Sequence, residues 1–146
     1  MHSEFYYPDS LTGAQLDFFL EAGWYIMHEG LFTTHFIAMD EELYRVFWLR
    51  YNLQMFRESK SIRKIIAANK KFSYAIKPLQ VTEEMEYLYK RYQSGIDFEG
   101  AHSVHSWLYN QTTPPGIFNS WVVEVRDGSR LIAAGVFDNG DKSIAG

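Results

Sequence analysis

The sequence has 146 residues, of which 47% are hydrophobic and 17% aromatic, and its formal net charge is -4. This length and apolar content suit one globular domain with a sizeable core and argue against a disordered chain. No run approaches the ~20 apolar residues that span a bilayer, and the acidic start, MHSE, is unlike a signal peptide. We therefore expect a cytoplasmic protein without a membrane partner. The chain has no cysteine, which excludes disulfides, iron–sulfur clusters and a thiol nucleophile.

The first third of the chain combines one helix signal with two strand signals. Thr12 and Gln15 have the spacing of a capping box and predict a helix at residues 13–22, which Gly23 ends. Residues 24–53 are dense in aromatic and β-branched side chains and predict strands at 25–36 and 43–53, joined by a turn at 40–42. We interpret Trp24 and Trp48 in this stretch as core residues.

A basic segment follows at residues 56–71, with six basic residues and one acidic residue. Ile62, Ile65 and Ile66 have helical spacing, which predicts a short helix that buries an isoleucine stripe and projects its cations into solvent. Such a run is often only a solvated face. Clustered lysines and arginines beside serines also suit contact with the phosphates of RNA.

The next elements are a strand and two helices. Residues 72–79 predict a strand that Pro78 closes, and Thr82 predicts the N-cap of a helix that ends before Gly95. A second amphipathic helix is predicted at 100–109, with Val104, Trp107 and Leu108 buried. His102 and His105 on this helix lack an acidic or cysteine partner nearby in sequence, so we expect no metal site there.

Residues 121–146 predict a meander of three antiparallel strands. Asp127-Gly128 and Asn139-Gly140 separate its apolar runs, and both dipeptides supply the positive φ angles of tight hairpins. Residues 131–136 are apolar or small throughout, which indicates a central strand covered on both faces. The predicted fold class is therefore α+β, with helices packed on a largely antiparallel sheet.

Five short pieces carry a family resemblance in their order and approximate spacing. They are GLFT (residues 30–33), FR (56–57) followed by Ser61 and RK (63–64), LYKRYQ (88–93), AGVFD (134–138) and SIAG (143–146). The succession resembles the arginyl-tRNA–protein transferase family, and in particular its bacterial members. The resemblance implies a GNAT-like fold, related to the N-acetyltransferases, and transfer of arginine or leucine from charged tRNA to the N-terminal α-amine of proteins with acidic N-terminal residues. It implies no cofactor besides the tRNA co-substrate.

The sequence departs from this family at two places. The family's usual cysteines have no counterpart, since residues 34–39 read THFIAM, and a redox-sensing role is therefore excluded. The family also continues past SIAG, so we expect a GNAT-like sheet that is incomplete at its C-terminal end. We divide the chain into an N-terminal helix and strand-rich segment, residues 1–55, and the first part of the transferase domain, residues 56–146.

The resemblance and the charge pattern together nominate site residues. The predicted contacts to tRNA phosphates are Arg57, Lys60, Arg63 and Lys64. Lys90 and Arg91 would bind the acceptor protein near its acidic N-terminal residue, although Arg91 also suits a surface salt bridge. The predicted catalytic residues are Tyr92 and Asp138, although Asp138 also suits the opening of a turn.

Two other functions stay open. An acetyl-CoA-dependent N-acetyltransferase of the same fold would need a glycine-rich loop after the sheet, and nothing before Gly146 supplies one. A non-catalytic remnant or RNA-binding module would need only the basic segment. For the transferase itself, no serine–histidine–acid triad can be singled out. None is required, because an α-amine with a pKa near ~7.7–8 is already partly neutral at cellular pH.

Overall fold

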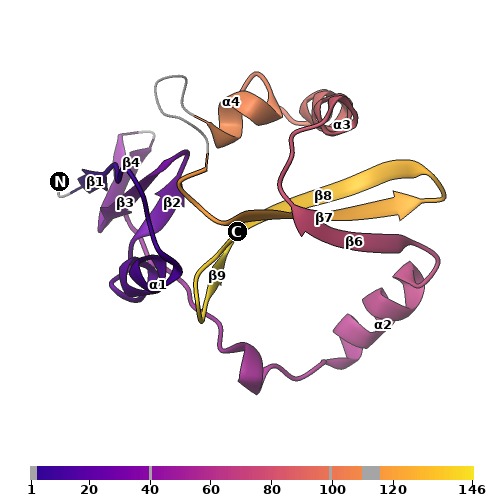
Figure 1. Cartoon of the computed structure of the whole chain (residues 1–146), viewed down its shortest axis with the longest axis horizontal. Helices are drawn as coiled ribbons and strands as arrows, with labels where there is room; N and C mark the ends of the chain where they lie inside the picture. The colour runs from indigo at the N-terminus through magenta and orange to yellow at the C-terminus, as the bar shows by residue number, and fades with distance from the viewer. Residues whose placement is uncertain (1–2, 40, 99, 110–115) are drawn as a thin grey trace.

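The computed structural model describes residues 3–39, 41–98, 100–109 and 116–146, and this part of the chain is an α+β fold with four α-helices (Figure 1). Its N-terminal elements are β1 (Ser3–Tyr6), α1 (Gly13–Glu21), β2 (Tyr25–Met27), β3 (Gly30–Thr34), β4 (Phe36–Met39), β5 (Glu42–Arg45) and the short 3-10 helix η1 (Leu53–Met55). The later elements are α2 (Lys60–Asn69), β6 (Ser73–Pro78), α3 (Glu83–Gln93), α4 (Val104–Leu108), β7 (Ser120–Asp127), β8 (Arg130–Asn139) and β9 (Ile144–Ala145).

The strands form three separate antiparallel sheets. Their orders are β1-β3-β2, β4-β5 and β6-β7-β8-β9. The last sheet contains the predicted meander, since β7, β8 and β9 pair in sequence order and β6 adds a strand beside β7. The predicted α+β class with largely antiparallel pairing is therefore confirmed.

The N-terminal segment follows the sequence signals at its helix but not at its strands. Thr12 caps α1 with a complete capping box, as its spacing predicts. The predicted strand at 25–36 is wrong as one element, because His28 turns the chain with a φ of 54° between β2 and β3. The prediction at 43–53 is also wrong beyond Arg45. There the aromatic residues contribute side-chain packing instead: the Trp48 ring stacks on Tyr25 with centroids 5.4 Å apart.

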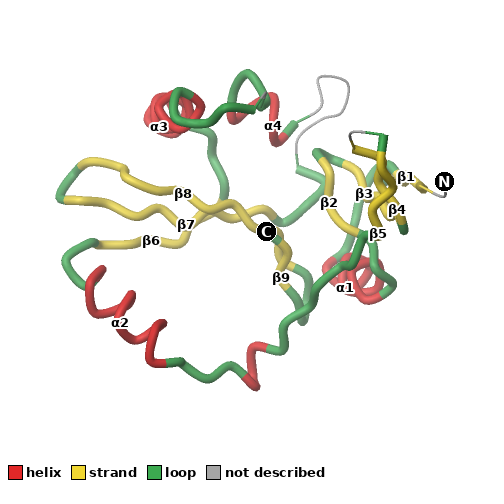
Figure 2. The backbone as a smooth tube through the Cα atoms, turned by 180° about the vertical axis from the view of Figure 1, so that it is seen from behind, coloured by secondary structure: helices red, strands yellow, loops and turns green. Residues whose placement is uncertain are grey.

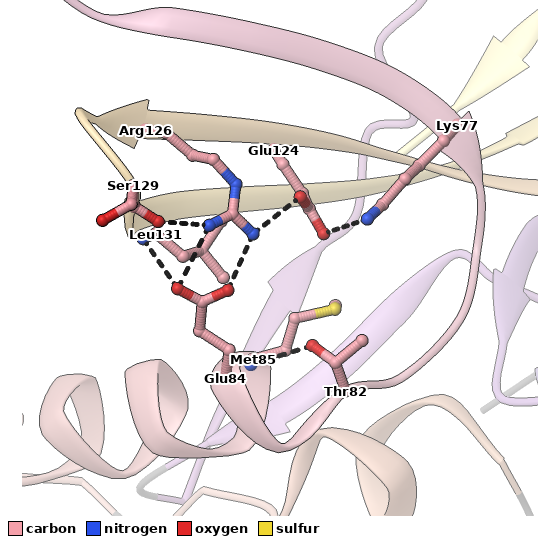
Figure 3. Close-up of polar contacts among 8 residues, drawn as sticks. All are labelled: Lys77, Thr82, Glu84, Met85, Glu124, Arg126, Ser129 and Leu131. Atoms are coloured by element: carbon pink, nitrogen blue, oxygen red, sulfur yellow. Dashed lines mark hydrogen bonds and ion pairs between the residues drawn. The ribbon is translucent and has the colours of Figure 1, made fainter.

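Helix α3 packs on one face of the four-stranded sheet through both apolar and charged side chains. Met85 of α3 lies in the buried core with Val104, Val122 and Leu131. Figure 3 shows the charged contact beside this core, where Glu84 accepts two hydrogen bonds from the Arg126 guanidinium, at 2.7 and 3.2 Å, and one from the Leu131 N–H at 2.9 Å. Thr82 caps the helix as predicted. The helix is thereby fixed both to β7 and to the start of β8.

The opposite face of this sheet is open where the sequence predicts cover. Helix α2 lies on the side away from α3 and α4 (Figures 1 and 2) and buries none of its residues. The predicted burial of the isoleucine stripe is wrong, since Ile65 and Ile66 are exposed. The prediction that the central strand is covered on both faces is also wrong, because Gly135 of β8 is exposed and nothing lies within 4 Å of the position that its Cβ would take. Amphipathic spacing shows which face of a helix is apolar, but not what packs against it.

Two further predictions are corrected at the elements around this sheet. The helix predicted at 100–109 is shorter, since Ser103 caps α4 and Tyr109 ends it; Val104 is buried, but Trp107 is 54% exposed. Gly128 has the predicted positive φ, at 62°, whereas Gly140 does not. The turn after β8 is closed instead by a hydrogen bond from the Gly140 N–H to the Ser143 carbonyl, at 2.8 Å.

That turn is held against α1. The Asp17 carboxylate accepts hydrogen bonds from the Lys142 N–H at 2.9 Å and from the Ser143 hydroxyl. These bonds, with that of Ser143 the strongest influence, lower the pKa of Asp17 below its usual 3.8. Asp17 thus links the N-terminal helix to the strand end that carries Asp138.

Candidate functional site

A pocket of about 460 Å³ lies between the N-terminal sheet and one end of the four-stranded sheet. Its walls come from β2 and the turn after it, Trp48, α4 with the residue that follows it, residues 116–120, and the ends of β8 and β9. Segments far apart in the sequence therefore meet here. A concave site formed between two packed units is a common location for a ligand.

Asp138 lies in this pocket, near the end of β8. The register of the meander pairs it with Ser120 of β7, and the Ser120 hydroxyl donates a hydrogen bond to Asp138 Oδ1. Burial raises the pKa of Asp138, and the Ser120 hydrogen bond only partly opposes this effect. Asp138 therefore retains a proton at higher pH than an exposed aspartate, which suits a group that exchanges protons with an amine.

Two residues that the sequence did not nominate accompany Asp138. Glu29 follows β2 in the turn to β3 and is 3% exposed, and Tyr109 follows α4. The pKa of Tyr109 is raised by burial first and then by the negative charges of Glu29 and Asp138. The phenol therefore keeps its proton near both carboxyl groups and can donate a hydrogen bond.

The turn that carries Glu29 is tied to α4. His28 Nδ1 lies 3.0 Å from the Trp107 carbonyl oxygen and, as a donor, bonds the turn between β2 and β3 to the helix. In the sequence, Glu29 stands out only because it is the one acidic residue of the aromatic stretch 24–36. Glu29 lies inside a pocket because α4 packs beside its turn, and α4 is more than 70 residues away in sequence. The neighbouring sequence therefore could not predict this position.

Aromatic rings form a wall of the pocket. Tyr25 and Trp48 stack with an interplanar angle of 10°, and Phe32 meets Trp48 edge-on with centroids 5.3 Å apart. The indole Nε1 of Trp48 is buried and has no hydrogen-bond partner within the described residues. The wall therefore presents flat aromatic faces to the pocket.

The structure places Tyr92 in a different cavity from Asp138. Tyr92 is exposed and lines a second, mainly apolar cavity of about 540 Å³ along α3, α4 and β8. The two predicted catalytic residues are thus not brought together in one pocket. Lys90 and Arg91 lie exposed in the last turn of the same helix, and Arg91 forms no ion pair with any residue in the described ranges.

The four predicted tRNA contacts are all exposed, on α2 and just before it. Ser59 caps this helix, and its side chain accepts the Ile62 N–H. The exposed cations are Arg57, Lys60, Arg63 and Lys64. Helix α2, which carries three of them, lies on the side of the sheet away from α4, and α4 borders the Asp138 pocket (Figures 1 and 2). The basic segment and the pocket are therefore separate surfaces.

Within the described ranges, no group of three or more histidine, aspartate or glutamate side chains could hold a metal ion. His102 and His105 are exposed, and the His105 ring contacts Tyr109 with centroids 5.0 Å apart. None of the described helices is long and apolar enough to cross a membrane.

Neither protein-family models nor the sequences of curated proteins give a match to this chain. The site therefore has to be judged on its own geometry. That geometry is a half-enclosed pocket with two carboxyl groups, a phenol and an aromatic wall, and a separate basic helix.

Proposed function

We propose that the protein is an aminoacyl-tRNA–protein transferase with a GNAT-like fold. The observation that carries the proposal is Asp138, a buried carboxyl group with a raised pKa at the end of a central strand, inside a pocket large enough for an amino-acid residue. The order β6, α3, α4, β7, β8, β9 supports a GNAT-like arrangement. The exposed cations of α2 add a surface suited to tRNA phosphates.

In the proposed reaction, the neutral α-amine of an acceptor protein attacks the carbonyl carbon of the aminoacyl ester. The new C–N bond becomes a peptide bond, and the C–O bond to the terminal ribose of the tRNA breaks. Asp138 accepts the proton that the amine loses, and Tyr109 donates a hydrogen bond to the oxygen that becomes negative. Asp138 then passes this proton to the ribose oxygen, which leaves as a hydroxyl group, and Asp138 returns to its starting state. Because the ester is already activated, placement of the amine supplies much of the rate, on the order of 7–11 kcal/mol in favourable cases.

A non-catalytic RNA-binding module is the second candidate. It is favoured by helix α2, which buries none of its residues, and by the separation of Tyr92 from Asp138 into two cavities. In that case the protein binds tRNA with the same basic segment but leaves the ester bond intact. The N-acetyltransferase alternative gains no support from the described residues.

A discharge assay separates the two candidates. Under single-turnover conditions, the transferase releases free tRNA from charged tRNA only when a peptide with an N-terminal aspartate or glutamate is added. We expect Asp138→Asn to slow this release by about 100-fold or more, the usual contribution of a positioned base. Asp97→Asn, a change at an exposed aspartate away from the pocket, leaves the rate unaltered. Discharge at the same rate without peptide, or no discharge at all, would count against the transferase.

A further inference from the structure

We infer that the cavity along α3, α4 and β8 is a subsite for the acceptor protein, and that it holds an apolar side chain on the acceptor's second residue. The inference rests on the proposed function, which identifies the peptide that reaches the cavity. It adds a preference beyond the acidic N-terminal residue, because an acceptor with a large apolar second residue gains contacts that other acceptors lack.

The cavity adjoins the Asp138 pocket, because the two share part of their walls. Trp107 and Val136 line both of them. Ala134, Val136 and Asp138 alternate along β8, so their side chains lie on one face of the sheet. With a rise of about 3.3 Å per residue, Ala134 lies roughly 13 Å from Asp138 along the strand. The pocket and the cavity therefore follow one another along this face, within the reach of a short extended peptide.

Polar contacts hold the walls of the cavity in place. The Glu86 carboxylate accepts hydrogen bonds from the N–H groups of Val104 and His105, each at 3.0 Å, and so fixes the start of α4 to α3. The Tyr89 hydroxyl donates a hydrogen bond to the Ala101 carbonyl at 3.0 Å, which ties the loop before α4 to the same helix. The cavity is thus formed before a ligand arrives, and its occupation needs little rearrangement.

The lining of the cavity suits an uncharged, apolar group. None of its described lining residues is charged. Met85 and Val104 are buried there, whereas Tyr92, Phe98 and Trp107 are each more than half exposed. A leucine or phenylalanine side chain in the cavity removes its own apolar surface and that of these rings from water. A charged side chain would lose its hydration there without gaining a partner.

The position of the cavity on α3 assigns it to the acceptor. Lys90 and Arg91, the predicted contacts of the acidic N-terminal residue, lie in the last turn of this helix, next to Tyr92 in sequence. When the α-amine lies at Asp138, the second Cα of the acceptor lies about 5 Å from that amine. A large side chain on this residue can then pass Val136 and enter the cavity, while the acidic side chain of the first residue is left to the two cations.

The test is equilibrium binding of short peptide amides to the whole chain, measured by isothermal titration calorimetry. The peptides are Asp-Leu-Gly, Asp-Asn-Gly, Asp-Gly-Gly and Asp-Gly-Leu, all with a free α-amine. Asparagine is polar but nearly the size of leucine, so the first two peptides separate apolar character from size. We expect Asp-Leu-Gly to bind about tenfold or more tightly than Asp-Asn-Gly and Asp-Gly-Gly, the ratio that burial of one leucine side chain gives. Asp-Gly-Leu should bind like Asp-Gly-Gly, because its leucine is one residue out of register.

The variant arm uses Ala134→Leu, which fills the cavity from β8, with Gly135→Leu as the matched control. Both variants place the same side chain on adjacent residues of one strand. The Gly135 side chain would lie on the opposite face, where nothing lies within 4 Å of the position of its Cβ. Ala134→Leu should remove the preference for Asp-Leu-Gly and leave the affinity for Asp-Gly-Gly unchanged. Gly135→Leu should keep the wild-type ratio.

Three results would overturn the inference. They are equal affinity for Asp-Leu-Gly and Asp-Asn-Gly, a preference that appears only with leucine at the third position, and a folded Ala134→Leu that keeps the wild-type preference. If Ala134→Leu does not fold, the peptide series on the wild-type protein still decides.

Failure of this inference and failure of the proposed function give different results. A protein that discharges charged tRNA onto peptides but binds all four peptides equally is a transferase without the apolar subsite. A protein that prefers Asp-Leu-Gly, loses this preference in Ala134→Leu and never discharges charged tRNA has the apolar subsite without the transferase activity.

Discussion

Glu124→Gln tests how α3 and β6 are fixed to the sheet. The Glu124 side chain is 4% exposed and lies 2.7 Å from Lys77 Nζ and 3.1 Å from Arg126 Nη2 (Figure 3). Glutamine removes the charge and turns one acceptor into a donor beside a cation. A hydrogen bond to a charged group contributes about 1.5–3 kcal/mol. Because Lys77 and Arg126 both reach water, neither becomes a buried unpaired charge, and we expect a loss of about 2 kcal/mol.

Urea unfolding measures this loss, with Asp127→Asn as the control. Asp127 is 53% exposed and lies 3.6 Å from Arg130, so its change should alter the free energy of unfolding by less than about 0.5 kcal/mol. The hydrogen bond from Lys77 lowers the pKa of Glu124 below its usual 4.5. Its stabilisation is therefore present above about pH 4.5 and is lost as the pH falls through the lowered pKa. Equal effects of the two variants at neutral pH would refute this account of the network.

Three further predictions concern the contact with α1 and the basic helix. The hydrogen bond between Asp17 and Ser143 should stabilise the fold above about pH 4, and this stabilisation should vanish as the pH falls through the lowered pKa of Asp17. The melting temperatures of wild type and Asp17→Asn should therefore converge in acid. Gly140→Ala should destabilise the fold by about 1–2 kcal/mol, because the new Cβ would lie 2.1 Å from Asp17 Oδ1. Arg63→Glu with Lys64→Glu should weaken tRNA binding and reduce the dependence of log affinity on log salt concentration by about 2.

Two of these predictions have a control variant, and all three have a contrary result. Gly135→Ala adds its Cβ to open space and should change stability by less than about 0.5 kcal/mol, so an equal loss for both glycines would contradict the close-contact explanation. A melting-temperature difference for Asp17→Asn that persists in acid would show that its effect is not electrostatic. Arg130→Glu, at the far turn of the meander, should leave the salt dependence unchanged. An unaltered slope in the α2 variant would remove that helix from the tRNA surface.

The features that short-range chemistry determines were predictable from the sequence. Thr12 and Thr82 cap their helices because a hydroxyl next to an amphipathic run satisfies free N–H groups. Gly128 closes the hairpin between β7 and β8, and the meander itself follows from the alternation of turns and apolar runs. Asp138 was nominated from its place near the end of the central strand, and it lies in the pocket.

The features that depend on distant partners were not predictable. Trp48 lies in a stretch with strong strand propensity, yet residues 46–50 form no strand and the Trp48 ring packs on Tyr25 instead. The isoleucine stripe of α2 shows the right period, but no local signal states whether another element covers it. Glu29 and Tyr109 become site residues only because the turn after β2 meets the end of α4.

Mass spectrometry of an acceptor peptide tests the proposed function most directly. A peptide with an N-terminal aspartate is incubated with the protein and with arginyl-tRNA or leucyl-tRNA in separate reactions. We predict that the peptide gains one arginine or one leucine on its α-amine, and that a peptide with a blocked N-terminus gains nothing. A peptide that keeps its original mass in both reactions, while the tRNA remains charged, would contradict the proposed transferase.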